Sequence, residues 1–346
     1  MKILDTTIRD GSYAINFKFS CRDVQDLVQK SQKIGIEYIE IGHGQGLNAS
    51  CPEHGIALQT DEEYMNAARS VADKSKLGFF CIPGIARLSD IETAKKNQMD
   101  FIRIGVSVAD YEKAIPYILQ GKKVGLQIFV NFMKTYTATP EEFAYASQMV
   151  YKHGADCVYI VDSAGCMSAH EIGEYIDRTR AVTDIQLGFH GHNNLGLAVD
   201  NTLYCIKKGM DYVDCSFQGL GRSLGNASIE QVVMVMEKRG FSTGFDIPRV
   251  LEYGYAGLRN VVRGKLTNPL DYMCGYTGFH SSFLKEIYKC SMKKQVDPLR
   301  LILAYSQNNK STMDYEQLCF IADNLPKDME DNPYSFADYF SEGYRD

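Results

Sequence analysis

Three patterns are missing from this 346-residue sequence, and each absence excludes a class of protein. No run of about 18 apolar residues occurs, so we expect no transmembrane helix and no contact with a membrane. No cluster of Lys or Arg is dense enough to neutralise a phosphate backbone, so we do not expect nucleic acid as a partner. None of the cysteines forms a C-x-x-C pair, which is typical of reduced thiols in a cytoplasmic protein.

What the sequence does contain, from residue 2 to about 240, is an alternation of short apolar runs with amphipathic segments. The runs are rich in Ile, Val, Phe and Leu, as in parallel strands that are covered on both faces. The segments between them begin at capping residues such as Ser20, Thr60 and Thr139 and end on glycines such as Gly35 and Gly154. Eight such pairs predict an α/β fold, a (β/α)8 TIM barrel. The eight runs cover residues 2–7, 38–43, 76–84, 101–107, 124–132, 157–165, 185–193 and 212–221.

An open, doubly wound sheet is the alternative fold. It would bring a glycine fingerprint after its first strand, whereas the chain reads DTTIRDGS there. We therefore expect a catalytic barrel over 1–243, a helical extension over 244–325 and an acidic tail over 326–346. Within the extension, helical patterns run over 248–263, 282–294 and 315–325.

Candidate catalytic residues stand where the first and seventh strands end, because barrel active sites form at the C-terminal ends of the strands. His190 and His192 are two residues apart, so their imidazoles lie on one face of a strand. Together with the carboxylate of Asp10 they predict a catalytic divalent site, for which Mn²⁺ or Mg²⁺ suits the sulfur-free ligands better than structural zinc does. Arg9 would stabilise a developing oxyanion if the strand has ended before it. The alternative is that Arg9 is only the ion-pair partner of Asp10.

Four further polar residues stand at predicted strand ends. Asp162 and Ser163 lie where the carboxylate of a substrate, or the side chain of Arg9, would need a partner. His43 is predicted to act as a second base or to contact the substrate, with a structural bond to the backbone as the alternative. Asn131 stands near the end of the fifth run.

Three motifs, DTTIRDGS (5–12), HGHNNLGLAVDNTL (190–203) and GLGRSLGNASIE (219–230), resemble those of the DRE-TIM metallolyase superfamily in this order. That group includes hydroxymethylglutaryl-CoA lyases, isopropylmalate synthases and 4-hydroxy-2-oxovalerate aldolases. The segment GYTGFHSSFLKEIYK (275–289) is similar to the aldolase branch, where the stretch G-Y-A-G-x-Y-S-S-F-L stands.

The resemblance implies a metal site and a role for the arginine. The metal ligands fall on Asp10, His190 and His192, with Asn226 as a further ligand in the lyase and synthase branches. Mn²⁺ is favoured, with Mg²⁺, Co²⁺ and Zn²⁺ as alternatives. Arg9 takes the position beside the enolate oxygen.

The sequence departs from the aldolase branch at two positions. The histidine regarded as the general base of that branch is replaced by Tyr13, and the second aromatic residue of the later segment is His280. Our hypothesis is that the two have exchanged roles, so that His280 takes the proton while Tyr13 donates a hydrogen bond or orients the substrate. The extension would then bring Tyr276 and His280 toward the mouth of the barrel.

The resemblance implies a carbon–carbon lyase that cleaves a 4-hydroxy-2-oxo acid to pyruvate and an aldehyde through an enolate stabilised by the metal and Arg9. One alternative is a Claisen-type acyltransferase that joins acyl-CoA to a 2-oxo acid, and another is a barrel that binds without catalysis. A hydroxymethylglutaryl-type lyase is disfavoured, because that type has a cysteine in this loop and the sequence GLGRSLGN has none. As partners the resemblance implies a small 2-oxo acid and an acylating aldehyde dehydrogenase, and we expect a homo-oligomer.

Overall fold

The computed structural model describes residues 1–263, 266–309, 312–327 and 339–340. The chain divides into two compact units, Met1–Val232 and Val233–Asp346, and each is described by itself. The predicted boundary at residue 243 stays a prediction, and most of the predicted acidic tail lies outside the described residues. Within the described part, no helix is both long enough and apolar enough to cross a bilayer.

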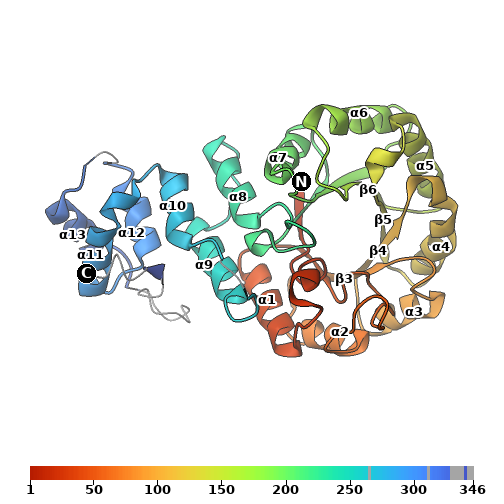
Figure 1. Cartoon of the computed structure of the whole chain (residues 1–346), viewed down its shortest axis with the longest axis horizontal. Helices are drawn as coiled ribbons and strands as arrows, with labels where there is room; N and C mark the ends of the chain where they lie inside the picture. Colours follow the sequence, from red (N-terminus) through yellow and green to blue (C-terminus); the bar gives the residue numbers. More distant parts are fainter. Residues whose placement is uncertain (264–265, 310–311, 328–338, 341–346) are drawn as a thin grey trace. The chain divides into compact units, whose positions relative to one another are not determined.

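The first unit is a closed barrel of eight parallel strands, in which each strand pairs with its neighbours in the sequence and β1 pairs with β8. Figure 1 shows the helices as a ring around these strands. Each of the eight predicted runs contains one strand, so the predicted (β/α)8 TIM barrel is confirmed. The strands are β1 (Lys2–Asp5), β2 (Tyr38–Ile41), β3 (Lys76–Cys81), β4 (Phe101–Val106), β5 (Gln127–Phe132), β6 (Cys157–Asp162), β7 (Gln186–Gly191) and β8 (Tyr212–Cys215).

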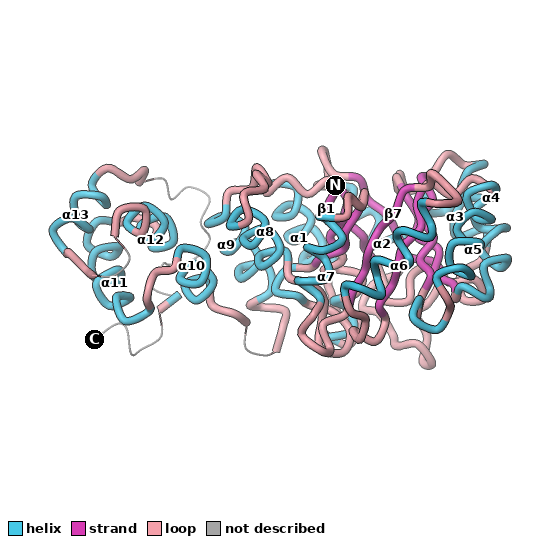
Figure 2. Tube along the Cα trace, turned by 90° about the horizontal axis from the view of Figure 1, so that it is seen from above, coloured by secondary structure: helices cyan, strands magenta, loops and turns pink. Residues whose placement is uncertain are grey.

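Among the helices of the barrel, several begin at side chains that bond the free amides of the first turn, and several end at a glycine. Ser20, Thr60 and Thr139 each accept a hydrogen bond from an amide in the first turn, and an acidic side chain there bonds back to the cap. Gly35 and Gly154 follow two helices with φ of 96° and 102°, a region that glycine enters without strain. In Figure 2 these helices lie outside the strands and cover them. They are α1 (Cys21–Lys33), α2 (Asp61–Arg69), α3 (Leu88–Lys96), α4 (Ile115–Lys123), α5 (Pro140–Lys152), α6 (Ala169–Arg180), α7 (Ala198–Lys207) and α8 (Ile229–Lys238), the last of which continues into the second unit.

The interior of the barrel is built in two layers, because residues two apart on a strand point to the same side. The lower layer consists of buried aromatic rings, which are Tyr38, Phe101, Phe129 and Tyr212. The upper layer stands two residues further along the same four strands and consists of buried polar side chains, which are Glu40, Arg103, Asn131 and Asp214. The aromatic layer thus forms an apolar floor beneath a polar layer at the C-terminal ends of the strands.

The second unit is helical. Three of its helices, α9 (Ile247–Leu258), α11 (Leu284–Lys294) and α13 (Tyr315–Asp323), confirm the helical patterns of the sequence. Two more, α10 (Pro269–Thr277) and α12 (Pro298–Tyr305), were not predicted. Both are short, and each begins with proline after an Asn or Asp cap, a helix-start signal that the sequence analysis did not use.

Candidate metal centre and active site

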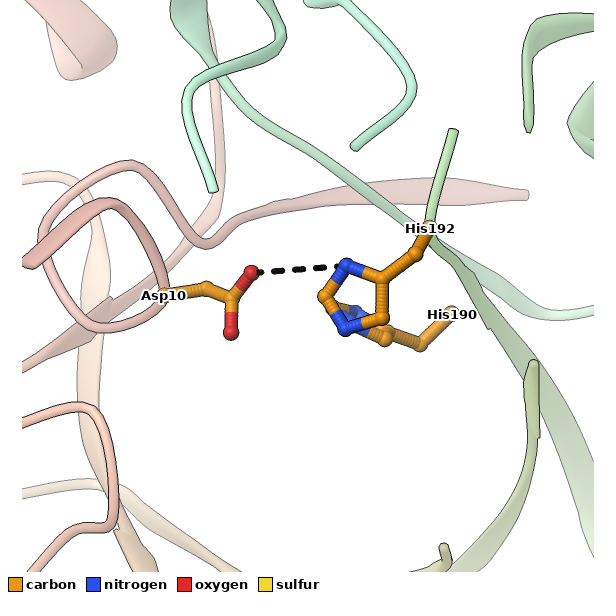
Figure 3. A group of neighbouring side chains, drawn as sticks. All are labelled: Asp10, His190 and His192. Carbon is orange, nitrogen blue, oxygen red and sulfur yellow. Dashed lines mark ion pairs between the residues drawn. The ribbon is translucent and has the colours of Figure 1, made fainter. Parts of the chain in front are cut away.

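Asp10, His190 and His192 form a buried cluster at the C-terminal end of the barrel. One ligand atom from each residue lies within 4.8 Å of the others, and all three side chains are buried. In Figure 3 the carboxylate faces the edge of the His192 ring, with His190 beside it; the dashed line joins Asp10 Oδ2 to His192 Nδ1 at 4.0 Å. Among the described residues this is the one such group of His, Cys, Asp and Glu side chains.

The turn after β1 carries Arg9 and Asp10 into the same site. The strand ends at Asp5, and the amide of Asp10 donates to the carbonyl of Thr6 at 2.9 Å. Because the strand has ended before Arg9 and Asp10, their side chains need not point to opposite faces, and both can enter one site. A side chain at Gly11 would meet Leu220 at 2.7 Å, so the absence of a Cβ lets this turn approach the loop after β8.

Asp10 is held by three donors. Its Oδ1 accepts from Arg9 NH1 at 2.7 Å, while its Oδ2 accepts from Asn226 Nδ2 at 2.8 Å and from the backbone amide of Arg222 at 3.2 Å. Burial alone would raise the pKa of Asp10, but the Arg9 guanidinium and the two imidazoles hold it well below its usual range. Asp10 is therefore an ionised carboxylate, which is the form that binds a metal. The ion pair that was the alternative role for Arg9 is present.

Contacts of Nδ1 orient the two histidine rings. His190 Nδ1 donates to Asp214 Oδ2 at 2.8 Å, so Nε2 is the ring nitrogen left available to a metal. This contact follows from the register, in which Phe189 of β7 lies opposite Val213 of β8. Burial lowers the pKa of His192, so its ring favours the neutral form that ligates metals.

A divalent ion fits this donor set. Asn226 Oδ1 is buried and accepts no hydrogen bond in the described part of the chain, while its Nδ2 fixes the amide against Asp10. Asn226 is also bridged to His192 through the backbone. The group then offers carboxylate oxygen, amide oxygen and imidazole nitrogen without sulfur, which suits Mn²⁺ or Mg²⁺.

A buried chain of charges continues from this cluster across the barrel. Arg9 Nε donates to Glu40 Oε2 at 2.7 Å, and Arg103 NH1 donates to the same oxygen at 2.9 Å. Arg103 NH2 then reaches Asp214 Oδ2 at 2.5 Å. Ions that share buried partners in this way hold one another in fixed orientations. This network of buried charges therefore connects Asp10 on one side of the metal cluster with His190 on the other.

Sequence reasoning missed Glu40, Arg103 and Asp214. The signal was present, because each is an ionisable residue within an otherwise apolar parallel strand. A charge in such a strand must point into the barrel and be paired there, since burial without a partner is costly.

Tyr13 lies beside the metal cluster on η1 (Gly11–Ile15) and is partly buried. Burial raises its pKa, with opposing contributions from Arg9 and Arg222, so the phenol is protonated at neutral pH. The Arg222 guanidinium lies 5.1 Å from the centre of its ring. Its predicted role as a hydrogen-bond donor to the substrate stays a prediction.

The other predicted substrate contacts in the barrel are bonded to the backbone. His43 Nδ1 accepts from the amide of Gln45 and its Nε2 lies 3.0 Å from the carbonyl of Gly55, which is the structural alternative given for it. The carboxylate of Asp162 accepts from the amides of Cys166 and Met167 and so closes the loop after β6.

Two more predicted strand-end residues differ in their exposure. Ser163 is partly exposed, and its hydroxyl accepts from the amide of Lys134 at 2.9 Å. Asn131 is buried, and its Oδ1 accepts from Arg103 Nε at 3.3 Å, so it belongs to the upper polar layer.

Tyr276 and His280 belong to the second unit. His280 is exposed and precedes η5 (Ser281–Phe283), where its Nδ1 accepts from the amide of Ser282 at 3.2 Å. Tyr276 is partly buried in the last turn of α10, and its carbonyl accepts from Lys238 Nζ at 2.9 Å. Their predicted participation in the barrel's site stays a prediction.

Comparison with known proteins shows the family. A family model described as HMGL-like matches residues 1–255. The closed parallel barrel, with a carboxylate and two imidazoles at its strand ends, makes this a TIM-barrel protein with a candidate metal centre. This chain belongs to the HMGL-like family, as the motifs of the sequence indicated.

Two curated relatives are named as enzymes that act on 2-oxo acids. Oxaloacetate decarboxylase of Mycobacterium tuberculosis is 37% identical over 250 residues, which cover 72% of this chain and 74% of that protein. 4-Hydroxy-2-oxovalerate aldolase of Carboxydothermus hydrogenoformans is 33% identical over 302 residues, which cover 86% and 89%. Both are lyases, so the prediction of a carbon–carbon lyase is confirmed.

Solved structures agree with the fold. The HMG-CoA lyase from Brucella melitensis superposes with a TM-score of 0.63 at 22% identity, covering 76% of this chain and 99% of that one. The hydroxymethylglutaryl-CoA lyase from Pseudomonas aeruginosa gives a TM-score of 0.66 at 15% identity, covering 79% and 97%.

Proposed function

We propose that this protein is a divalent-metal-dependent aldolase that cleaves a 4-hydroxy-2-oxo acid to pyruvate and an aldehyde. The observation that carries the proposal is the buried group of Asp10, His190 and His192, tied through Asp10 to the fixed guanidinium of Arg9. The relatives named 4-hydroxy-2-oxovalerate aldolase, which match most of the chain, support the same reaction. Mn²⁺ is our choice of metal, and its role when bound is to polarise the 2-oxo group as a Lewis acid.

Arg9 supplies the positive charge of the site. Glu40 and Asp10 hold two of its nitrogens, and the ring of Phe80 lies 4.8 Å from its guanidinium carbon. In the described part of the chain its NH2 group has no hydrogen-bond partner. A donor fixed in this way stabilises an oxyanion without reorganisation during the reaction.

The proposed cleavage then needs one base and one donor. The base removes the proton of the 4-hydroxyl, the C3–C4 bond breaks, and C4 becomes the carbonyl of the aldehyde. The electron pair of that bond forms the enolate of pyruvate, whose oxygen Arg9 faces, and a proton added at C3 completes pyruvate. We assign the base to His280 and the donor to Tyr13, with Ser163 and Tyr276 as substrate contacts.

A second candidate is decarboxylation of a 2-oxo acid whose C4 is a carboxylate, as the name of the Mycobacterium tuberculosis relative suggests. The observation that favours it is that Tyr13, rather than a histidine base, stands on η1 beside the cluster, and burial raises the pKa of its phenol, which makes it a donor and a poor base. Loss of CO₂ breaks the same C3–C4 bond and gives the same enolate, but no hydroxyl proton has to be removed.

The test is to incubate metal-loaded protein with 4-hydroxy-2-oxo acids of graded chain length and with oxaloacetate, and to measure pyruvate. We expect pyruvate from at least one 4-hydroxy-2-oxo acid, and none after chelation or in the Asp10→Asn variant. Free thiol released from acyl-CoA plus a 2-oxo acid, with no cleavage of any substrate, would instead identify the Claisen-type acyltransferase.

We also propose an acylating aldehyde dehydrogenase as a partner, because such an enzyme would consume the aldehyde product. We further propose a homo-oligomer in the cytoplasm. Co-purification with such a dehydrogenase tests the first proposal, and the mass of the purified protein in solution tests the second.

A further inference from the structure

We propose that Arg222 binds a second carboxylate of the substrate, so that the preferred substrates are 2-oxo dicarboxylates. This inference rests on the proposed function and narrows its substrate class. It gives a role to the guanidinium at the rim of the metal cluster, which the cleavage chemistry does not use.

The backbone of Arg222 is fixed next to the metal cluster. Its amide donates to Asp10 Oδ2 at 3.2 Å, and its carbonyl accepts from the amide of Gly225 at 2.9 Å. The carbonyl of Gly225 in turn accepts from the amide of Asn193, just past β7. The loop that carries Arg222 is therefore tied to both strand ends that supply the cluster.

The side chain of Arg222 extends to the rim. It is exposed, and its guanidinium lies 5.1 Å from the ring centre of Tyr13, which stands three residues after Asp10. No carboxylate in the described part of the chain forms an ion pair with it. An arginine held against an aromatic ring keeps its planar fork of donors available for a carboxylate.

The balance of charge supports a dianionic substrate. In the buried chain, Arg9 and Arg103 face Asp10, Glu40 and Asp214, which leaves one net negative charge. A divalent ion makes this one net positive charge, and Arg222 at the rim raises it to two. A 2-oxo acid with one carboxylate would leave a positive charge, whereas a dicarboxylate would neutralise the site.

The backbone of Arg222 joins the two proposed binding points, the metal cluster and the guanidinium. One carboxylate and the 2-oxo group would lie at the cluster of Asp10, His190 and His192. The far carboxylate would then lie one arginine side chain away, since the amide of Arg222 already touches Asp10. The same arrangement serves cleavage of a 4-hydroxy-2-oxo dicarboxylate and decarboxylation of a 2-oxo dicarboxylate.

Two matched pairs of compounds test the inference. 4-Hydroxy-2-oxopentanedioate and 4-hydroxy-2-oxopentanoate differ only in whether C5 is a carboxylate or a methyl group, and both can be cleaved to pyruvate. 2-Oxopentanedioate and 2-oxopentanoate repeat this difference without the 4-hydroxyl, so they bind without retro-aldol cleavage. Wild-type enzyme, Arg222→Gln, Arg222→Lys and Arg178→Gln are compared in kcat/KM for the first pair and in calorimetric dissociation constants for the second.

We expect the wild type to prefer the dicarboxylate in both pairs by about tenfold or more, because a charge-assisted bond to arginine is gained. Arg222→Gln should weaken the dicarboxylate alone by about tenfold to hundredfold, through KM more than kcat. Arg222→Lys should restore part of the loss, since it keeps the charge but not the fork. Arg178→Gln, which removes an equal charge paired with Glu141 on the outer face of the barrel, should change neither pair.

Equal affinity of the wild type for both members of each pair would overturn the inference, as would an Arg222→Gln variant that loses both members alike. These results are separable from failure of the proposed function. If neither hydroxylated compound releases pyruvate, the aldolase proposal fails, whereas the binding of the two inert compounds still decides whether Arg222 recognises a carboxylate.

Discussion

Arg103 and Asp214 are 111 residues apart in the sequence and form an ion pair of 2.5 Å inside the barrel, where both side chains are buried. The same oxygen of Asp214 accepts from His190 at 2.8 Å. One carboxylate therefore joins the buried charges to a predicted metal ligand. Burial opposes its ionisation, but Arg103 and His190 lower the pKa of Asp214, so that it stays charged.

Asp214→Asn should weaken the metal site without removing a ligand. An amide accepts the Nδ1 proton of His190 less strongly, so the ring loses its fixed tautomer and orientation. We expect metal affinity to fall by about 10- to 100-fold, measured by calorimetric titration with Mn²⁺. Asp177→Asn, which removes an exposed carboxylate paired with Lys208, is the control. Equal affinity in the two variants would show that Asp214 does not position His190.

Arg103→Met should destabilise the barrel strongly. The substitution leaves the carboxylates of Glu40 and Asp214 buried without the cation between them, and we expect a loss of about 3–5 kcal/mol in the free energy of unfolding. Arg178→Met breaks only an exposed pair with Glu141 and should cost less than about 1 kcal/mol. Denaturant unfolding measures both, and similar losses in the two variants would contradict the role of Arg103.

Glu230 should make the stability of the protein depend on pH. It is fully buried, accepts from Ser228 Oγ and the amide of Gln218, and burial raises its pKa from 4.5 to about 7. Between these values the folded chain keeps a proton that the unfolded chain releases, so stability falls as pH rises from about 4.5 to about 7. By linkage the loss amounts to about 3 kcal/mol.

Glu230→Gln removes this titration. Denaturant unfolding of the wild type and the variant at about pH 4.5 and about pH 8 should show a larger fall for the wild type. Two proteins whose stabilities change in parallel over this interval would rule out the raised pKa of Glu230.

Two variants test the exchange of roles between Tyr13 and His280. If His280 is the base, His280→Ala should lower the cleavage rate by about 10²- to 10⁴-fold and leave exchange of the methyl protons of pyruvate in D₂O. Tyr13→Phe keeps the ring against Arg222 and should have the smaller effect on cleavage. His170→Ala, on the exposed side of α6, is the control. Retained exchange with cleavage lost only in Tyr13→Phe would assign the essential proton transfer to Tyr13 instead.

The barrel and the metal cluster could be predicted from the sequence, because each follows from a pattern of residues that are close together in the chain. The eight apolar runs and their capped helices give the barrel, since a parallel strand covered on both faces needs an unbroken apolar run. The pair His190 and His192 needs only the two-residue repeat of a strand. Asp10 follows from the rule that barrel sites form where strands end.

Other features could be seen only once distant strands were brought together. The partners Glu40, Arg103 and Asp214 come from three strands, and their pairing depends on barrel closure and register. The backbone contacts of His43 and Asp162 likewise depend on how their own loops fold, and their predicted contact with substrate stays a prediction.

The sequence by itself determined the barrel, the family and the residues of the candidate metal centre, because each follows from a local pattern or a motif. Only the tertiary structure decided which charges are paired and which guanidinium remains for a ligand. Arg9 is fixed between Asp10 and Glu40, whereas Arg222 lies against Tyr13 at the rim. The physical reason is that a buried charge requires a partner, and the fold alone determines which opposite charges lie within reach.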